Sequence, residues 1–153
     1  MTNNEVKQFI IFRLSGENYG IDIQKIKTIE KTMSFARVPK APEYVNGVIN
    51  LRGEIIPVMS LRNRFGFEIK EFDNQTRIII IDILESPIGL IVDEVKEVLS
   101  LDADSIENAQ DIKESEIDDE YISGVGKVGE EIITLLNLET LIKSSFDLEE
   151  DGE

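Results

Sequence analysis

Short apolar segments that alternate with glycine-containing turns run along most of the chain. Phe9 to Phe12 and Tyr19 to Ile23 lie on either side of a polar turn, and Val48 to Leu51 and Ile55 to Met59 lie on either side of Arg52-Gly53-Glu54. Runs of this length, rich in β-branched residues and bounded by turn residues, are typical of strands. The pattern therefore predicts two β-hairpins, the second with an arginine and a glycine at its tip.

The sequence also contains an internal repeat. When it is shifted by 69 residues, residues 9–29 align with residues 78–98 without a gap, and four of the 21 pairs are identical. A shift of 77 residues aligns residues 44–61 with residues 121–138, with seven of 18 pairs identical. Such self-similarity indicates two copies of one structural unit. The change in shift places an insertion of eight residues between Val98 and Tyr121, where we expect an acidic surface loop.

Each copy contains several short strands and no long helix, which favours a mainly β fold of two small antiparallel barrels or sandwiches. We expect one subdomain over residues 6–75 and another over residues 76–146, packed together because so few residues barely support an isolated core. A short C-terminal helix is predicted from its N-cap Asn137 to Phe146, with its apolar side clamping the barrels, and a helical turn over Leu61 to Phe65. The acidic tail, residues 147–153, is expected to be disordered.

Composition narrows the possible chemistry. The 153 residues include no histidine and no cysteine, which removes the commonest general base and every thiolate metal site. The net charge of −15 repels nucleic acid, and no apolar run is long enough to span a membrane. We therefore expect a soluble cytoplasmic protein that neither binds nucleic acid nor inserts into a membrane.

No catalytic or cofactor site stands out among the sequence motifs. Residues 118–120 are acidic, but they have no loop glycine and no alternating ligand pattern, so a metal site there is disfavoured. Residues 124–129 are rich in glycine, but they do not open a helix and lack the arrangement of a P-loop. We predict no enzymatic activity, no metal and no cofactor.

Charge is divided unevenly along the chain. Residues 1–76 carry 11 basic and 9 acidic side chains, a net charge of +2, whereas residues 77–153 carry 5 basic and 22 acidic ones, a net charge of −17. Solvation of the surface is the simpler explanation for so many acids. The alternative is electrostatic complementarity to a partner.

Arg52 is the candidate binding residue at the tip of the second hairpin. It could be a solvated turn residue, or a docking residue displayed on a rigid frame. Gly47 recurs in the second copy as Gly124, so we assign it first to backbone geometry or close packing. Arg52 falls instead on Gly129, so the fold does not require a cation there, and its guanidinium could reach a carboxylate or backbone carbonyls of a partner.

The stretch from Gly47 to Arg62, Gly-Val-Ile-Asn-Leu-Arg-Gly-Glu-Ile-Ile-Pro-Val-Met-Ser-Leu-Arg, closely resembles the CheW family of bacterial chemotaxis coupling proteins. Residues 19–23, 38–39, 88–93 and 122–126 also resemble the family, so the similarity covers residues 9–146. The resemblance implies a fold of two five-stranded SH3-like β-barrels side by side, in agreement with the internal repeat.

The resemblance also implies a function. Family members are non-enzymatic adaptors that link the cytoplasmic tip of methyl-accepting chemoreceptors to the regulatory domain of the histidine kinase CheA, within receptor arrays at the membrane. The receptor tip is expected in the groove between the barrels and the kinase at the barrel ends, on residues that the sequence does not identify. The receptor-binding residues implied for this chain are Ile26, Gly47, Asn50, Leu51, Arg52, Gly53 and Gly89. Among them, Gly47 and Gly89 could act indirectly through barrel shape.

One position departs from the family pattern, and two other functions stay open. Thr28 stands where many members carry an acid, which puts in doubt any receptor ion pair there. Head-to-tail pairing of barrels, as the resemblance implies, would suit the unlike charges of the two halves. A carboxylate-dependent hydrolase would need carboxylates of shifted pKa in a closed pocket, and a peptide-binding double barrel outside chemotaxis would differ only in its ligand.

Overall fold

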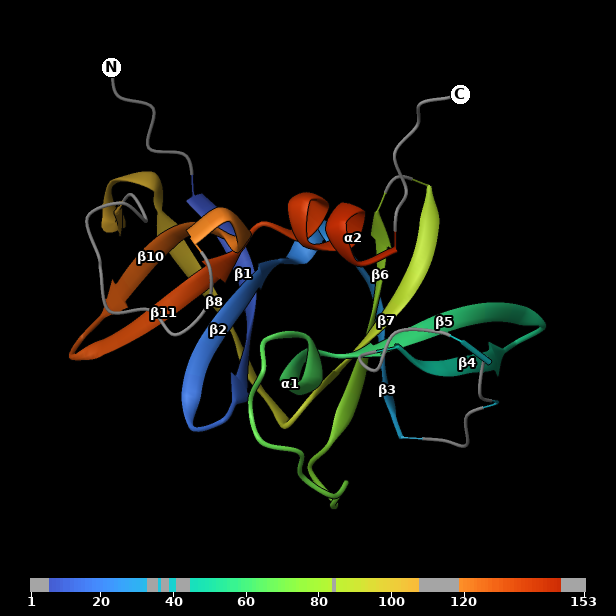
Figure 1. Cartoon of the computed structure of the whole chain (residues 1–153). Helices are drawn as coiled ribbons and strands as arrows, with labels where there is room; N and C mark the ends of the chain where they lie inside the picture. The colour runs from blue at the N-terminus through green and yellow to red at the C-terminus, as the bar shows by residue number, and fades with distance from the viewer. Residues whose placement is uncertain are drawn as a thin grey trace.

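The strands form two sheets in the computed structural model, which describes residues 6–32, 36, 39–40, 45–83, 85–107 and 119–146. Sheet A has the strand order β8-β1-β2-β11-β10-β9, and sheet B has the order β3-β6-β7-β5-β4. Figure 1 shows sheet A on the left and sheet B on the right, with the helix α2 over their junction. The predicted fold class, mainly β with two barrel units and a short C-terminal helix, is confirmed.

The bounds of the elements are as follows. Sheet A consists of β1 (Val6–Leu14), β2 (Glu17–Asp22), β8 (Glu94–Asp102), β9 (Ile106–Glu107), β10 (Ile122–Val128) and β11 (Glu131–Leu136). Sheet B consists of β3 (Ile26–Lys31), β4 (Val45–Leu51), β5 (Glu54–Ser60), β6 (Arg77–Ile83) and β7 (Ser86–Val92). The helices are α1 (Leu61–Arg64) and α2 (Leu138–Phe146), and the short 3-10 segments are η1 (Ile23–Lys25), η2 (Ala103–Ser105) and η4 (Asp119–Tyr121).

The central strands of each sheet are buried on both faces. In β1, Phe12 lies in a large core shared by the two sheets, whereas Ile11 packs in a smaller core of sheet A. In β6, Ile79 lies in the shared core and Ile80 in a smaller core of sheet B. A strand with two buried faces is apolar without alternation, which explains why these segments read as continuous apolar runs.

The two repeats exchange their first hairpins. Strands β1 and β2 pair with β8 and β11 of the second repeat, and β6 and β7 pair with β3 and β5 of the first. The exchange is symmetric, because Leu135 pairs with Gly20 in sheet A as Val58 pairs with Gly89 in sheet B. The division between the sheets therefore does not follow the expected boundary between residues 75 and 76. Equivalent strands offer a hairpin the same partner twice, and strand patterns do not choose between them.

Both predicted helical segments are present. The Thr140 N–H donates to Asn137 Oδ1 at 3.2 Å, so Asn137 caps α2 as expected. Leu141 and Ile142 of α2 lie fully buried in the shared core, which confirms that this helix packs on both sheets. The turn α1 directly follows β5 and buries Leu61 in the same core.

Several expectations fall elsewhere in the chain. The centre of the acidic insertion, residues 108–118, and the tail, residues 147–153, lie outside the described residues. Within the described part, neither helix has the length and apolar character needed to cross a bilayer.

Candidate binding site

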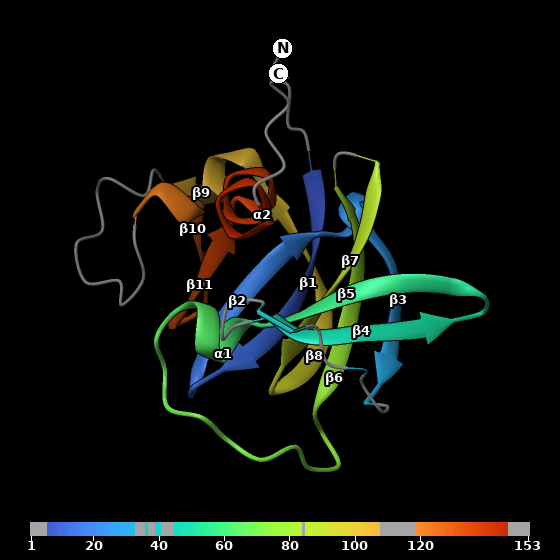
Figure 2. The same cartoon turned by 45° about the vertical axis from the view of Figure 1, so that its right-hand side comes forward.

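The tip of the β4–β5 hairpin is a tight turn in which both central residues have left-handed backbone conformations. Leu51 pairs with Glu54 across it, and Arg52 and Gly53 have φ angles of 54° and 87°. The Asn50 Oδ1 accepts a hydrogen bond of 3.0 Å from the Gly53 N–H. Two positive φ angles define a type I′ turn, whose twist suits a β-hairpin. The turn therefore presents Arg52 from a defined frame, and Figures 1 and 2 show the hairpin extending away from sheet A.

Arg52 is an exposed cation with a carboxylate beside it. Its side chain is 73% exposed, and its Nη2 lies 3.7 Å from Oε2 of Glu30, a side chain that is 18% exposed. The hydroxyl of Thr28 donates to the same Glu30 oxygen at 3.0 Å. This surface therefore holds a carboxylate two residues beyond Thr28, the position where the family pattern led us to look for one. An ion pair this open to water contributes less than about 1 kcal/mol, so Arg52 is free to exchange partners.

A second ion pair joins the same hairpin to β3. Lys27 Nζ lies 3.4 Å from Oε1 of Glu54, which follows the turn directly. Strand β3 is at one end of sheet B, and β4 is at the other. The two ion pairs therefore bring the hairpin tip against β3 and curl sheet B towards closure.

Ile26 and Leu51 are each half-buried and flank this region from within. Ile26 begins β3 and packs against the shared core, whereas Leu51 packs against the core of sheet B. The structure thus brings the predicted residues Asn50 to Gly53 together at one tip and places Ile26 on the neighbouring strand β3.

The two remaining predicted residues, Gly47 and Gly89, are buried. Gly47 has a φ of 150°, which residues with a side chain rarely adopt. A Cβ atom built on Gly89 would lie 2.9 Å from Cγ2 of Ile78 and 3.3 Å from Cγ2 of Val58. Neither glycine presents a side chain to a partner, so any effect on binding would pass through the shape of sheet B.

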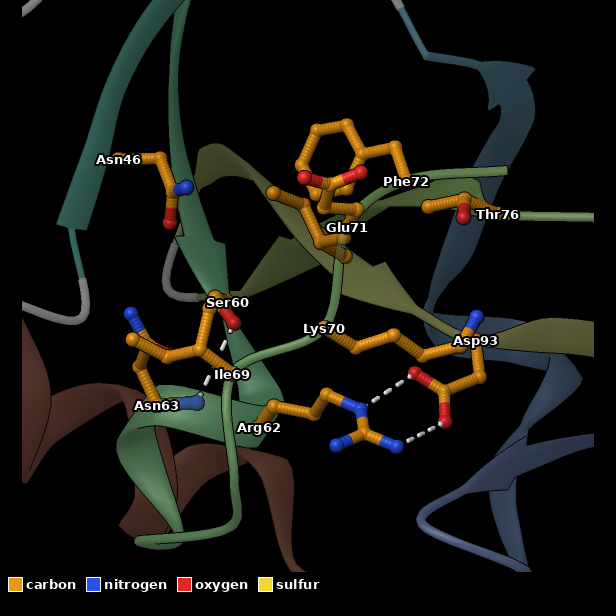
Figure 3. A pocket seen from close by; sticks show the side chains of 11 residues that line it. Asn46, Ser60, Arg62, Asn63, Ile69, Lys70, Glu71, Phe72, Thr76 and Asp93 are labelled. Atoms are coloured by element: carbon orange, nitrogen blue, oxygen red, sulfur yellow. Dashed lines mark hydrogen bonds and ion pairs between the residues drawn. The ribbon is translucent and has the colours of Figure 1, made fainter.

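Two cavities of the described part lie away from Arg52. The larger, about 370 Å³, opens beside the start of α2 and is floored by Phe9, Leu135 and Leu136. The smaller, about 60 Å³, lies between α1 and the loop that precedes β6 (Figure 3). Arg52 lines neither cavity, which makes the hairpin tip a surface site rather than a pocket.

The carboxyl group with the clearest pKa shift offers no support for a hydrolase. Hydrogen bonds from the Lys70 ammonium and the Gln75 backbone N–H lower the pKa of the exposed Asp73 carboxyl to about 2. A general acid needs the opposite shift, so that it stays protonated near neutral pH.

Sequence reasoning missed the partners that position the hairpin tip. Glu30 and Lys27 touch Arg52 and Glu54, yet in the sequence they are charges on a short, ambiguous segment. The available signal was the identity of Lys27 with Lys96 in the repeat, which marks the position as structurally repeated.

Comparisons with known proteins identify the relatives of this chain. The family model described as a CheW-like domain matches residues 8–146. The chemotaxis protein CheW of Klebsiella aerogenes is 36% identical over 138 residues, which cover 90% of this chain and 82% of that protein. The chemotaxis protein CheW of Helicobacter pylori is 33% identical over 145 residues, 94% of this chain and 86% of that protein. The crystal structure of the scaffolding protein TtCheW from Thermoanaerobacter tengcongensis superimposes with a TM-score of 0.83 and 38% identity, over 90% of this chain and 92% of that one.

Proposed function

The chain belongs to the CheW family, and we propose that it couples methyl-accepting chemoreceptors to the histidine kinase CheA by binding both at once. As a member of this family it is a non-enzymatic scaffold of chemotaxis signalling. We place it in the cytoplasm, at the receptor arrays, because the receptor tip that it would bind lies there.

The mechanism needs binding free energy alone. A scaffold that holds receptor and kinase in one geometry transmits a signal when it stabilises two kinase conformations unequally. Coupling energies between linked sites are typically about 1 to 3 kcal/mol, which corresponds to a change of roughly 5- to 150-fold in an equilibrium constant. No covalent step and no cofactor enters this account.

We assign receptor contact to the hairpin tip, Asn50 to Gly53, together with Ile26 on β3. The supporting observation is the 73% exposure of Arg52 on a tight turn, with only a weak, open ion pair to Glu30 printed on its surface. A receptor carboxylate or backbone carbonyl could replace Glu30 at little cost. Gly47 and Gly89 would act on the same site through backbone shape.

We assign the kinase to the barrel ends, where unlike barrels would meet. The net charges of +2 and −17 along the two halves of the sequence favour such unlike contacts over like ones. Reversing the acids Asp102 and Asp104, both exposed in the described part, should then weaken kinase binding most at low salt. An unchanged affinity and salt dependence would exclude this electrostatic contribution.

The test of the receptor site is Arg52→Ala, with binding measured by isothermal titration against a purified receptor-tip fragment. Loss of a charge-assisted contact of about 1.5 to 3 kcal/mol lowers affinity by roughly 10- to 100-fold. Folding should be nearly unchanged, because alanine keeps the backbone turn and loses only an exposed ion pair. The matched control is Lys127→Ala, which removes an exposed cation of the other sheet whose Nζ lies 3.4 Å from Glu107.

Two results would contradict this assignment. Equal affinity of Arg52→Ala and wild type for the receptor fragment would remove the arginine from the site. A large loss of thermal stability would show that it is a structural residue instead. Failure of the wild-type protein to bind either receptor fragment or kinase regulatory domain would contradict the coupling function itself.

A further inference from the structure

The short helix α1 carries two arginines that both leave sheet B for elements of sheet A. It begins after Ser60, whose Oγ accepts from the Asn63 N–H at 3.2 Å, and Leu61 anchors it in the shared core. Arg62 and Arg64 therefore project from a segment whose own position is fixed by a cap and a buried side chain.

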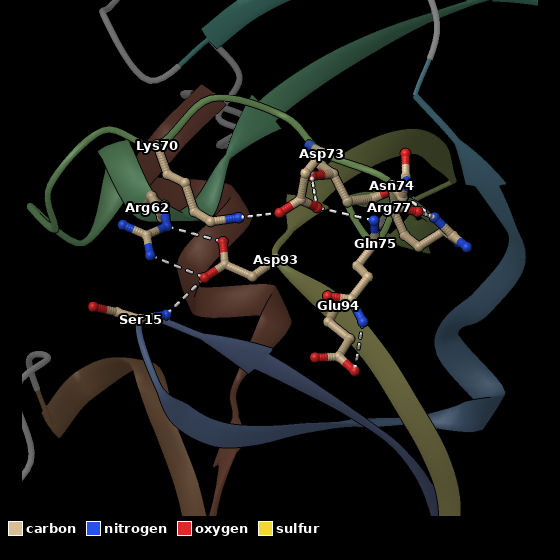
Figure 4. Close-up of polar contacts among 10 residues, drawn as sticks. Ser15, Arg62, Lys70, Asp73, Asn74, Gln75, Arg77, Asp93 and Glu94 are labelled. Carbon is tan, nitrogen blue, oxygen red and sulfur yellow. Dashed lines mark hydrogen bonds and ion pairs between the residues drawn. The ribbon is translucent and has the colours of Figure 1, made fainter.

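Arg62 makes a two-point ion pair across the junction of the sheets. Its Nε and Nη2 donate to Oδ1 and Oδ2 of Asp93 at 2.9 and 3.0 Å, and the two side chains are 15% and 18% exposed (Figure 4). Asp93 lies between β7 of sheet B and β8 of sheet A. Its Oδ2 also accepts from the Ser15 N–H at 2.9 Å, in the turn between β1 and β2. The network thus ties α1 to a hairpin of sheet A.

Other contacts complete the environment of this ion pair. Arg62 Nη1 donates to the Glu68 carbonyl, and the Asp93 N–H donates to the Arg13 carbonyl at 3.1 Å. The hydrogen bond to Asp93 raises the pKa of the Arg62 guanidinium above its ordinary value, against the opposing effect of partial burial.

Arg64 makes an equally connected set of contacts on the other side of α1. Its Nε donates to Ser145 Oγ at 2.6 Å, and its Nη2 donates to Ser144 Oγ and to the Tyr121 hydroxyl, both at 2.8 Å. Its guanidinium carbon also lies 4.9 Å from the centre of the Tyr121 ring. Ser144 and Ser145 belong to α2, and Tyr121 directly precedes β10 of sheet A.

The internal repeat shows that neither arginine is required to build a barrel. A shift of 77 residues places Arg62 on Glu139 and Arg64 on Leu141. At the equivalent place in the other copy, Glu139 pairs with Lys25 at 3.0 Å, with side chains that are 49% and 38% exposed. The fold thus repeats an ion pair at this place, with opposite polarity and in a more open setting.

We infer that Arg62 and Arg64 are positioning residues for coupling, which fix the orientation of the two barrels relative to each other. Apolar burial in the shared core holds the barrels together but is not directional. A two-point guanidinium contact specifies both distance and angle, so it can hold one orientation among several that the core allows. This inference rests on the proposed function, since it concerns how a receptor on one barrel affects a kinase on the other.

The principal variant is Arg62→Lys, which keeps the charge but replaces the two-point contact with a single-point one. We expect its affinities for the receptor fragment and for the kinase regulatory domain, measured separately, to stay within about twofold of wild type. Activation of the kinase in reconstituted receptor complexes should fall by about 5-fold or more, the lower end of typical coupling factors. The double variant Arg62→Asp with Asp93→Arg should restore part of this activation, and Lys25→Ala, at the open equivalent pair, should leave it unchanged.

The orientation itself can be measured with spin labels, because the chain has no cysteine. Labels on Lys31→Cys of sheet B and Glu97→Cys of sheet A, both exposed, report the distance between the sheets. We expect a narrow distance distribution in the wild-type background and a broader or shifted one with Arg62→Lys. An unchanged distribution together with full kinase activation would overturn the inference. Absence of activation by wild type would contradict the proposed function instead, and the distance measurement would still decide the role of Arg62.

Discussion

Replacing Gly89 with alanine separates packing from direct contact at the candidate site. A Cβ atom there would lie 2.9 Å from Ile78 Cγ2 and 3.3 Å from both Ile80 Cδ1 and Val58 Cγ2. All three neighbours are fully buried branched side chains, so they can give way only by straining the core of sheet B. Added volume in such a core costs about 1 to 3 kcal/mol. At roughly 2 to 4 °C per kcal/mol for a chain of this size, the midpoint of thermal unfolding should fall by roughly 2 to 12 °C.

The chain supplies a matched control in Gly20, the equivalent glycine of sheet A. A Cβ atom there would lie 2.8 Å from Leu135 Cδ2 and 3.3 Å from Ile11 Cδ1, so Gly20→Ala should lower stability by a similar amount. The receptor site lies on sheet B in our proposal, so only Gly89→Ala should also weaken binding of the receptor-tip fragment. Chemical denaturation and isothermal titration on both variants provide the comparison. Unchanged stability of Gly89→Ala would refute the packing argument, and equal loss of binding in both variants would refute the local one.

Three further predictions concern single side chains. Lys70→Ala should raise the pKa of Asp73 from about 2 towards its ordinary value of 3.8, as followed by carboxyl NMR; because folding lowers this pKa, the associated stabilisation is complete above that ordinary value and is lost as pH falls towards 2. Asn137→Ala should cost about 1 kcal/mol in urea denaturation by removing the cap of α2, and a change within error would show that Asn137 does not stabilise it. Ile26→Asp should weaken receptor binding in a protein that still folds, and retained affinity would remove Ile26 from the site.

Local structure was the part of the fold that the sequence predicted well. The turn at Arg52 and Gly53, the strand beginning at Ile26 and the cap at Asn137 each depend on a few neighbouring residues, and each is present. Gly53 was expected to have a positive φ, but Arg52 has one too. A left-handed arginine is tolerated because the type I′ turn fits the twist of the hairpin, a requirement of the paired strands and not of the residue.

Pairing between distant strands was the part that the sequence could not supply. The repeat made β1 and β6 equivalent, and so it left open which sheet each would join. The signal that could have decided it was the continuous apolar run Ile78 to Ile81, which a strand exposed on one face would not need. The ion pairs Arg52–Glu30 and Arg62–Asp93 join residues 22 and 31 positions apart, and only the assembled sheets bring them together.

The exchange of hairpins bears directly on how a scaffold with no moving cofactor could transmit a signal. Each sheet is completed by a hairpin from the other repeat, and those hairpins also build the shared core. The strand that carries the tip with Arg52 on one side, β5, pairs on its other side with β7. Strand β7 ends at Val92, next to Asp93, whose carboxylate holds Arg62 and the β1–β2 turn. A continuous series of paired strands and ion pairs therefore connects the hairpin tip in one sheet to the other sheet. A change in the tip of a fraction of an ångström would then reach the second barrel through packed elements that resist deformation, rather than through a flexible linker.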